Sequence, residues 1–176
     1  MRLIGLDPGL RSTGWGVIEV DGNRLRHLGN GAIATKSGAE TASRLAQLFE
    51  GIMSVIDDYQ PDEAAVEETF VNRNPQSALK LGLARGVVLL APARAGLRIA
   101  EYAPNQIKKA VVGSGHAAKE QVALMVAILL PGAAPESSDA ADALAVAICH
   151  SHRAVTAGRW VRPGAGDGST IAEGRR

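Results

Sequence analysis

The amino-acid sequence predicts an α/β fold, a mixed five-stranded sheet with helices on both faces. Three strand patterns come first and short turns join them, which is typical of an antiparallel meander. Two later strand patterns each follow a long helical segment, and a parallel strand requires such a crossover. Three helical segments then close the folded part of the chain, so both faces of the sheet can be covered.

The antiparallel half of the sheet is expected at residues 2–7, 13–20 and 24–35. Residues 2–7 are a nearly continuous apolar run, which indicates a buried strand. The second and third segments are joined at Asp21-Gly22-Asn23, a sequence typical of a hairpin turn. The three segments therefore predict neighbouring antiparallel strands.

The parallel half is expected from an alternation of helices and strands. Residues 40–59 carry apolar side chains at the period of an amphipathic helix, and Pro61 ends that helix. Residues 63–70 predict a short strand, residues 74–96 a second helix and residues 97–103 the fifth strand. Each of these strands can then join the sheet parallel to the first.

Helices around residues 104–112 and 117–130, and a last helix from about 138 to 152, complete a single domain. A chain of 176 residues is long enough for one domain with a real core, which we place over residues 1–155. Residues 156–176 are rich in glycine and end in basic side chains, and we expect them to be disordered.

The composition excludes several classes of protein. Apolar residues make up 46% and charged residues 21%, which is ordinary for a globular protein, while 3% aromatic residues are too few for an RRM-type stacking platform. No apolar stretch is long enough to cross a bilayer and no signal-peptide layout is visible, so no membrane partner is expected. A single cysteine, Cys149, cannot form an internal disulfide, which favours a cytoplasmic protein.

Charged residues are segregated along the chain. Residues 40–70 hold eight acidic side chains and one arginine, whereas residues 71–119 hold eight basic side chains and one glutamate. This pattern can place an acidic pocket that binds cations beside a basic face that binds a polyanion. Two solvated helix faces would produce the same pattern, so charge alone does not decide between them.

The ends of the first and fourth strands carry acids. Asp7 stands directly before Pro8 and Gly9. An acid there is a common turn initiator, but it can also hold a metal ion or lie beside a phosphate cradled by backbone amides. Glu67 and Glu68 follow the apolar run of the fourth strand. Because successive side chains point to opposite faces, only one of them can share a face with Asp7, and the spacing leaves open which one.

Asp139 and Asp142 lie three residues apart in the last helix and therefore share a face. In one interpretation Asp139 is the N-cap and Asp142 the third helical residue, as in a capping box. In the other, small side chains let the helix lie close to the sheet, which brings both carboxylates near Asp7. These small side chains are at positions 140, 141, 143, 145 and 147.

Carboxylates from separate elements that converge on one rim of a sheet cannot all stay charged in a dry site without a cation. Hard oxygen ligands in that number suit Mg²⁺ or Mn²⁺. Two such ions would stabilise the attacking and leaving oxygens while a phosphodiester is hydrolysed. Basic side chains from residues 71–119 would then pair with the phosphates of the nucleic acid.

Other candidate residues have weaker signals. His116 can be a proton carrier or a residue at a helix start, and His150 and His152 are interpreted as surface residues late in the last helix. Cys149 has no histidine at a spacing that indicates a thiol nucleophile. Phe70 follows the fourth strand and is either buried or a base-stacking side chain.

Four stretches of the sequence together resemble the RuvC family of crossover junction endodeoxyribonucleases. They are "IGLDPGLRSTGWGVIE", "AAVEETFVNRNPQSALKLGLARGVV", "EYAPNQIKKAVVGSGHAAKEQV" and "DAADALAVAICH", in that order. The resemblance runs from residue 2 to about residue 153. It implies an RNase H-like fold for the domain over residues 1–155.

The resemblance also implies roles for individual residues. Glu67 matches an acid of the family, whereas Glu68 matches a variable neutral position. Lys108 and Lys119 match lysines near the scissile phosphate, and Phe70 matches a loop aromatic that contacts bases. The implied catalytic and metal-binding acids are Asp7, Glu67, Asp139 and Asp142. The expected DNA contacts are Phe70, Arg73, Lys80, Arg85, Lys108, Lys109 and Lys119.

Members of this family are structure-specific endonucleases, and the resemblance implies the same activity here. The expected substrate is a four-way (Holliday) DNA junction, which a homodimer resolves by paired nicks during recombination and repair. The implied cofactor is Mg²⁺, with two ions per active site and Mn²⁺ able to substitute. The implied further partner is a branch-migration motor complex of the RuvA and RuvB type.

Other protein classes share part of the pattern. Sugar kinases and heat-shock chaperone ATPases also begin with a strand, an Asp-x-Gly turn and a hairpin, but they need two such domains around a nucleotide. A junction-binding protein that has lost cleavage would retain the fold, and the intact acids argue against it. A related nuclease acting on structured RNA is the third alternative, against which the match through the lysine stretch argues.

Overall fold

In the computed structural model, five strands form one mixed sheet in the order β3-β2-β1-β4-β5, as the sequence predicts. The structure describes residues 1–69 and 74–156. The strands are β1 (Arg2–Asp7), β2 (Ser12–Asp21), β3 (Arg24–Ala34), β4 (Glu63–Glu67) and β5 (Arg98–Tyr102). The strands β1, β2 and β3 pair antiparallel, and β4 and β5 extend the sheet in parallel.

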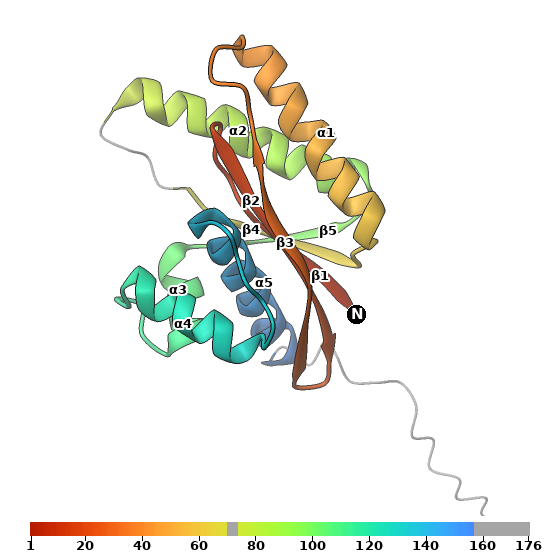
Figure 1. Cartoon of the computed structure of the whole chain (residues 1–176), viewed down its shortest axis with the longest axis vertical. Coiled ribbons are helices and arrows are strands. Elements are labelled where there is room, and N and C mark those ends of the chain that lie inside the picture. The colour runs from red at the N-terminus through yellow and green to blue at the C-terminus, as the bar shows by residue number, and fades with distance from the viewer. Residues whose placement is uncertain (70–73, 157–176) are drawn as a thin grey trace, which may run out of the picture.

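Five helices cover the two faces of this sheet (Figure 1). They are α1 (Thr41–Tyr59), α2 (Pro75–Arg94), α3 (Pro104–Val112), α4 (Lys119–Leu129) and α5 (Ser138–Thr156). Figure 1 shows the sheet nearly edge-on, with α1 and α2 on one side and α3, α4 and α5 on the other. In the described part of the chain, no helix is both long and apolar enough to span a membrane.

The fourth strand is shorter than predicted. It ends at Glu67, whereas the sequence predicts that it continues to residue 70. Its neighbours explain the difference. The strand β1 ends at Asp7 and β5 ends at Tyr102, so no ladder continues beyond Glu67. The last bond on this edge joins the Glu68 amide to the Tyr102 carbonyl oxygen at 2.8 Å.

The alternation of side chains on β1 divides the core into two layers. Leu3 packs in the layer that contains α3, α4 and α5. Ile4 and Leu6 pack in the layer that contains α1 and α2. Because the period of a strand is two, Asp7 belongs to the same face as Leu3 and Gly5, the face that α5 covers.

Glycines let α5 lie directly on the backbone of the sheet. A Cβ at Gly5 would lie 2.1 Å from the Ala143 carbonyl oxygen, and a Cβ at Gly14 would lie 2.0 Å from the Asp139 carbonyl oxygen. Any larger residue at these positions must push the helix away from the strands. This close approach brings the first turns of α5 to the rim of the sheet.

Candidate active site

The register of the parallel strands places two acids side by side. Leu6 of β1 is paired with Val66 of β4, so the next residues, Asp7 and Glu67, end neighbouring strands at the same edge. Both side chains belong to the face that α5 covers. The choice between Glu67 and Glu68 is therefore decided by the register, and Glu68 is not among the residues that line the pocket described below.

The acids of α5 approach the same edge from the helix. The Ser137 hydroxyl accepts a hydrogen bond from the Ala140 amide at 3.1 Å, and the Ser137 carbonyl accepts one from the Ala141 amide. Ser137 is therefore the residue that caps α5, and the interpretation of Asp139 as the N-cap is wrong. Gly14 is paired with Asp7 across the sheet and also admits the Asp139 backbone, so Asp139 lies near Asp7.

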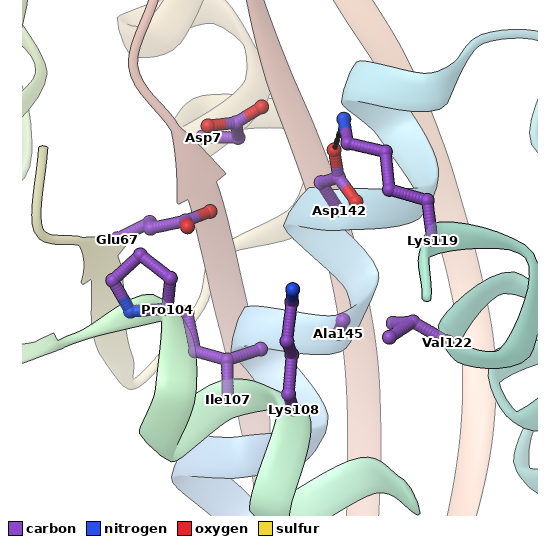
Figure 2. Close-up of a pocket in the computed structure, with 9 residues that line it drawn as sticks. All are labelled: Asp7, Glu67, Pro104, Ile107, Lys108, Lys119, Val122, Asp142 and Ala145. Atoms are coloured by element: carbon purple, nitrogen blue, oxygen red, sulfur yellow. Dashed lines mark hydrogen bonds and ion pairs between the residues drawn. The ribbon is translucent and has the colours of Figure 1, made fainter. Parts of the chain in front are cut away.

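A pocket of about 290 Å³ opens between these elements (Figure 2). Figure 2 shows Asp7, Glu67 and Asp142 around one space, with Lys108 directed into it from α3. Asp139 does not line the pocket, but its negative charge contributes to the raised pKa of Asp7. The lining residues are Asp7, Glu67, Pro104, Ile107, Lys108, Lys119, Val122, Asp142 and Ala145.

Burial and mutual repulsion make these carboxylates weak acids. Burial raises the pKa of Asp7 to about 8, and the charges of Glu67, Asp142 and Asp139 contribute to the rise. Burial also raises the pKa of Glu67 to about 7, with a further contribution from Asp142. At neutral pH both groups therefore retain protons for much of the time, unless a cation neutralises the pocket.

Lysines supply part of the missing positive charge. The Lys119 ammonium donates a hydrogen bond to Asp142 at 3.0 Å, and this contact raises the pKa of Lys119. The charges of Lys119 and Lys108 lower the pKa of Glu67, which opposes the effect of burial. The Lys119 side chain is 72% exposed, so its ammonium can also reach a ligand outside the pocket.

The donor atoms of the pocket fit a hard divalent cation in kind. Asp7, Glu67 and Asp142 all offer carboxylate oxygens, which Mg²⁺ and Mn²⁺ prefer. Within the described residues, however, no three acidic, histidine or cysteine side chains are close enough together to form a ready-made metal site.

Hydrogen bonds from distant residues hold the loop that follows Asp7. The Thr13 hydroxyl donates to the Gly9 carbonyl at 2.8 Å, and the Thr35 hydroxyl donates to the Leu10 carbonyl at 2.7 Å. Arg44 of α1 donates to the Thr35 hydroxyl at 2.8 Å and to the Leu10 carbonyl at 3.1 Å. Sequence reasoning missed Thr35 and Arg44, because neither belongs to a motif and both act through long-range contacts.

The remaining expected DNA contacts are less closely grouped. Lys109 is exposed on α3, whereas Lys80 and Arg85 are on α2, across the sheet from the pocket. The Arg85 guanidinium forms an ion pair with Glu101 of β5. Phe70 and Arg73 lie outside the described residues, as does the predicted disordered tail from residue 157 onward.

The histidines are placed differently from one another. His150 is 2% exposed, so its interpretation as a surface residue is wrong. Its ring hydrogen-bonds to Glu63 at 2.8 Å and to the Tyr102 hydroxyl at 2.7 Å. These long-range partners have no signal in the local sequence. His152 is exposed as expected, and His116 is exposed and does not line the pocket.

Comparison with known proteins gives consistent matches. The family model described as crossover junction endodeoxyribonuclease RuvC matches residues 3–150. A protein of that name from Rhodospirillum rubrum is 64% identical over 152 residues, covering 86% of this chain and 90% of the relative. Another from Paramagnetospirillum magneticum is 60% identical over 162 residues, covering 92% and 98%.

A solved structure supports the same relationship in three dimensions. Thermus thermophilus RuvC in complex with a Holliday junction substrate superposes with a TM-score of 0.83 at 38% identity. The match covers 89% of this chain and 96% of that chain. The RNase H-like fold expected from the sequence is therefore confirmed.

Proposed function

The chain belongs to the RuvC family of crossover junction endodeoxyribonucleases, and we propose from this premise that it resolves four-way (Holliday) DNA junctions. It is a metal-dependent nuclease that hydrolyses phosphodiester bonds during recombination and repair. One observation supports the proposal that the reaction takes place in the pocket at the end of β1 and β4. Asp7, Glu67 and Asp142 come from three separate elements and surround one pocket that two lysines also line.

We propose that Asp7, Glu67, Asp139 and Asp142 hold two Mg²⁺ ions, and that Mn²⁺ can replace them. The raised pKa values of Asp7 and Glu67 support this proposal, because burial and the neighbouring acids both disfavour the charged carboxylates, and a cation would relieve both effects. Bound ions would supply positive charge to the attacking and leaving oxygens. The acids themselves provide the ligands and fix where the phosphate must lie.

Lys108 and Lys119 are proposed to bind and orient the phosphate that is cut. Hydrolysis joins a water oxygen to phosphorus, breaks one phosphorus–ester bond and leaves a proton on the departing oxygen. Lys119 hydrogen-bonds to Asp142 without DNA and is exposed enough to turn to a phosphate oxygen. Lys108 points into the pocket from α3 (Figure 2), and its charge lowers the pKa of Glu67.

The wider DNA surface remains a proposal from the sequence. Exposed Lys80 and Lys109 are suited to phosphates further along the DNA. Arg85 must release Glu101 before it can bind DNA, so we propose it as a weaker contact. Phe70 and Arg73, which follow β4 in the sequence, are proposed to contact bases and backbone at the junction.

We propose that the protein acts as a homodimer, since paired cuts in one junction need two active sites. An apolar stripe on α2 supports this proposal. Leu79, Leu83 and Leu90 are 67%, 41% and 51% exposed and lie on one face of the helix. Gly82 and Gly86 on the same helix have open space around them, which permits a second helix to approach closely.

We further propose that residues 1–155 form the nuclease domain and that the protein works in the cytoplasm, where its DNA substrate is. A branch-migration motor complex of the RuvA and RuvB type is the proposed partner. Co-purification of the wild-type protein with such a motor on a four-way junction tests this partner. Failure to co-purify, under conditions in which junction binding persists, would contradict it.

Cleavage of a synthetic four-way junction tests the function. We expect symmetric nicks on the junction in the presence of Mg²⁺ and no cutting of a plain duplex of the same sequence. Asp7→Asn should abolish the nicks and leave junction binding in a gel-shift assay intact. The proposal fails if Asp7→Asn still cuts, or if the wild-type protein hydrolyses ATP without DNA and leaves the junction whole.

A further inference from the structure

A second polar cluster joins Glu63, at the end of β4 that is far from the pocket, to Tyr102 of β5, whose backbone is paired with Glu67. His150 of α5 is 2% exposed and lies between Glu63 and Tyr102, which are 9% and 8% exposed. Its Nε2 atom is 2.8 Å from a Glu63 carboxylate oxygen, and its Nδ1 atom is 2.7 Å from the Tyr102 hydroxyl. Arg98 lies 3.8 Å from Glu63, and the Arg153 guanidinium lies 5.5 Å above the Tyr102 ring.

Glu63, His150 and Tyr102 form a continuous chain of hydrogen bonds. An ionised Glu63 only accepts hydrogen bonds, so the Nε2 atom of His150 carries the proton between them. The Tyr102 hydroxyl then donates to Nδ1 when the imidazole is neutral, or accepts from Nδ1–H when it is charged. Each group is satisfied in either state, and loss of one partner leaves a buried polar atom unpaired.

This chain joins α5 to the sheet at a defined distance from the acids. Glu63 and Glu67 lie four residues apart on the same face of β4, which is about 13 Å of strand. Asp142 and His150 lie eight residues apart on α5, which is about 12 Å of helix. The strand and the helix therefore meet twice, at Glu63 with His150 and at Glu67 with Asp142.

The two meeting points have opposite electrostatics. Glu67 and Asp142 are both acids and line the same pocket. Asp142 forms an ion pair with the largely exposed ammonium of Lys119. At the other end, a carboxylate, an imidazole and a phenol hold the helix through short directional bonds.

Apolar contacts hold the first turns of α5 closely against the sheet. Alanines of α5 lie over Gly5 of β1, and Leu144 and Ile148 are fully buried in the core. The hydrophobic effect that contributes to this packing is non-directional. The hydrogen bonds of His150 add a directional constraint on the rotation and the axial position of the helix. The buried small residues are Ala140, Ala141, Ala143, Ala145 and Ala147.

We propose that the Glu63–His150–Tyr102 chain is a positioning device that holds the acids of α5 in place against their repulsion from Asp7 and Glu67. These residues do not line the catalytic pocket. They set the distance over which Asp139 and Asp142 can share a divalent cation with the acids of the sheet. The inference rests on the proposed nuclease function of that pocket.

Divalent-metal binding tests this inference directly. We expect Tyr102→Phe and Glu63→Ala to weaken Mn²⁺ binding in a calorimetric titration about tenfold, and Glu63→Gln, which keeps an acceptor for His150, by less than about threefold. Junction affinity measured without metal should stay within twofold, because none of these residues lines the pocket. Excess metal should restore most of the cleavage rate.

Ser151→Ala is the matched control. Ser151 is also buried on α5, but its hydroxyl bonds to the Ile148 carbonyl within the helix. Its loss should lower the melting temperature and leave Mn²⁺ affinity unchanged. The inference is overturned if Tyr102→Phe and Glu63→Ala also lose only stability. If Glu63→Ala does not fold, the Mn²⁺ affinity of Tyr102→Phe decides the test. If the wild-type protein binds Mn²⁺ but cuts no junction, the proposed function fails, and the titrations still decide the positioning role.

Discussion

The strand β4 and the helix α5 meet at two places that are built in opposite ways. At Glu63 and His150, complementary groups are buried and bonded to each other. At Glu67 and Asp142, like charges share a pocket that is open to a ligand. The acids at the catalytic end of this helix therefore destabilise the fold, and contacts elsewhere in the fold must hold them in place.

The largest effect is expected where the helix touches the sheet. Gly14→Ala places a Cβ 2.0 Å from the Asp139 carbonyl oxygen, so α5 must move away from β2. We expect a loss of about 3 kcal/mol in stability, from overpacking. Cleavage should fall by more than about a hundredfold, because the acids no longer meet. Denaturant unfolding and junction cleavage measure the two effects.

Gly38→Ala is the control for this change, because nothing lies within 4 Å of a Cβ at that position. It should leave both stability and cleavage near wild-type values. Equal effects of the two substitutions would show that the close approach of α5 is unimportant.

Removing the positive charge at the acidic end should have the next largest effect. Lys119→Met takes away the partner of Asp142 and a charge that lowers the pKa of Asp7 and Glu67. Both pKa values then rise, so metal binding should shift to higher pH. We expect a loss of about tenfold or more in cleavage at pH 7 that shrinks at pH 9. A loss that is independent of pH would contradict the electrostatic role of Lys119.

The burial and mutual repulsion of the acids should also be visible in the stability of the metal-free protein. The pKa of Asp7 is about 8 and that of Glu67 about 7 in the fold, whereas unfolded carboxyl groups titrate near 4. Between about pH 4 and 8 the folded state binds more protons than the unfolded state, so stability falls as pH rises.

Asp7→Asn should remove most of this dependence. In a chelator at pH 8 the variant should be more stable than the wild type by about 2 kcal/mol, on the order of 5 °C in melting temperature. The difference should shrink toward pH 5. Melting curves with and without Mg²⁺ measure it, and a variant that is less stable than the wild type at pH 8 would refute the repulsion.

The smallest effect is expected from the residues that hold the loop after Asp7. Arg44→Met removes the hydrogen bonds to Leu10 and to Thr35. We expect a roughly threefold fall in kcat with little change in KM, since Arg44 does not line the pocket. Arg44→Lys, which keeps one donor, should recover part of the loss. An altered KM with unchanged kcat would indicate a direct DNA contact instead.

Much of the fold could be predicted from local patterns, and the long-range parts could not. Helical periods and turn residues were sufficient to place the strands and helices, because each depends on near neighbours in the chain. The end of β4 was wrong by three residues, since the lengths of β1 and β5 decide it. The prediction that His150 lies at the surface was wrong, because its hydrogen-bond partners Tyr102 and Glu63 are 48 and 87 residues away in the chain.

Local sequence patterns were enough to predict the α/β order, the small side chains that let α5 lie close to the sheet, and the acidic residues that end β1, end β4 and begin α5. Strand spacing left the choice between Glu67 and Glu68 open and the family resemblance favoured Glu67, and the register of the folded sheet places Glu67 beside Asp7. The capping of α5 by Ser137 was visible only in the folded structure. The tertiary structure alone decided that Glu63, His150 and Tyr102 form a buried chain. The physical reason is that strand register and helix docking are cooperative properties of the whole core, and a local pattern does not encode which distant side chains meet.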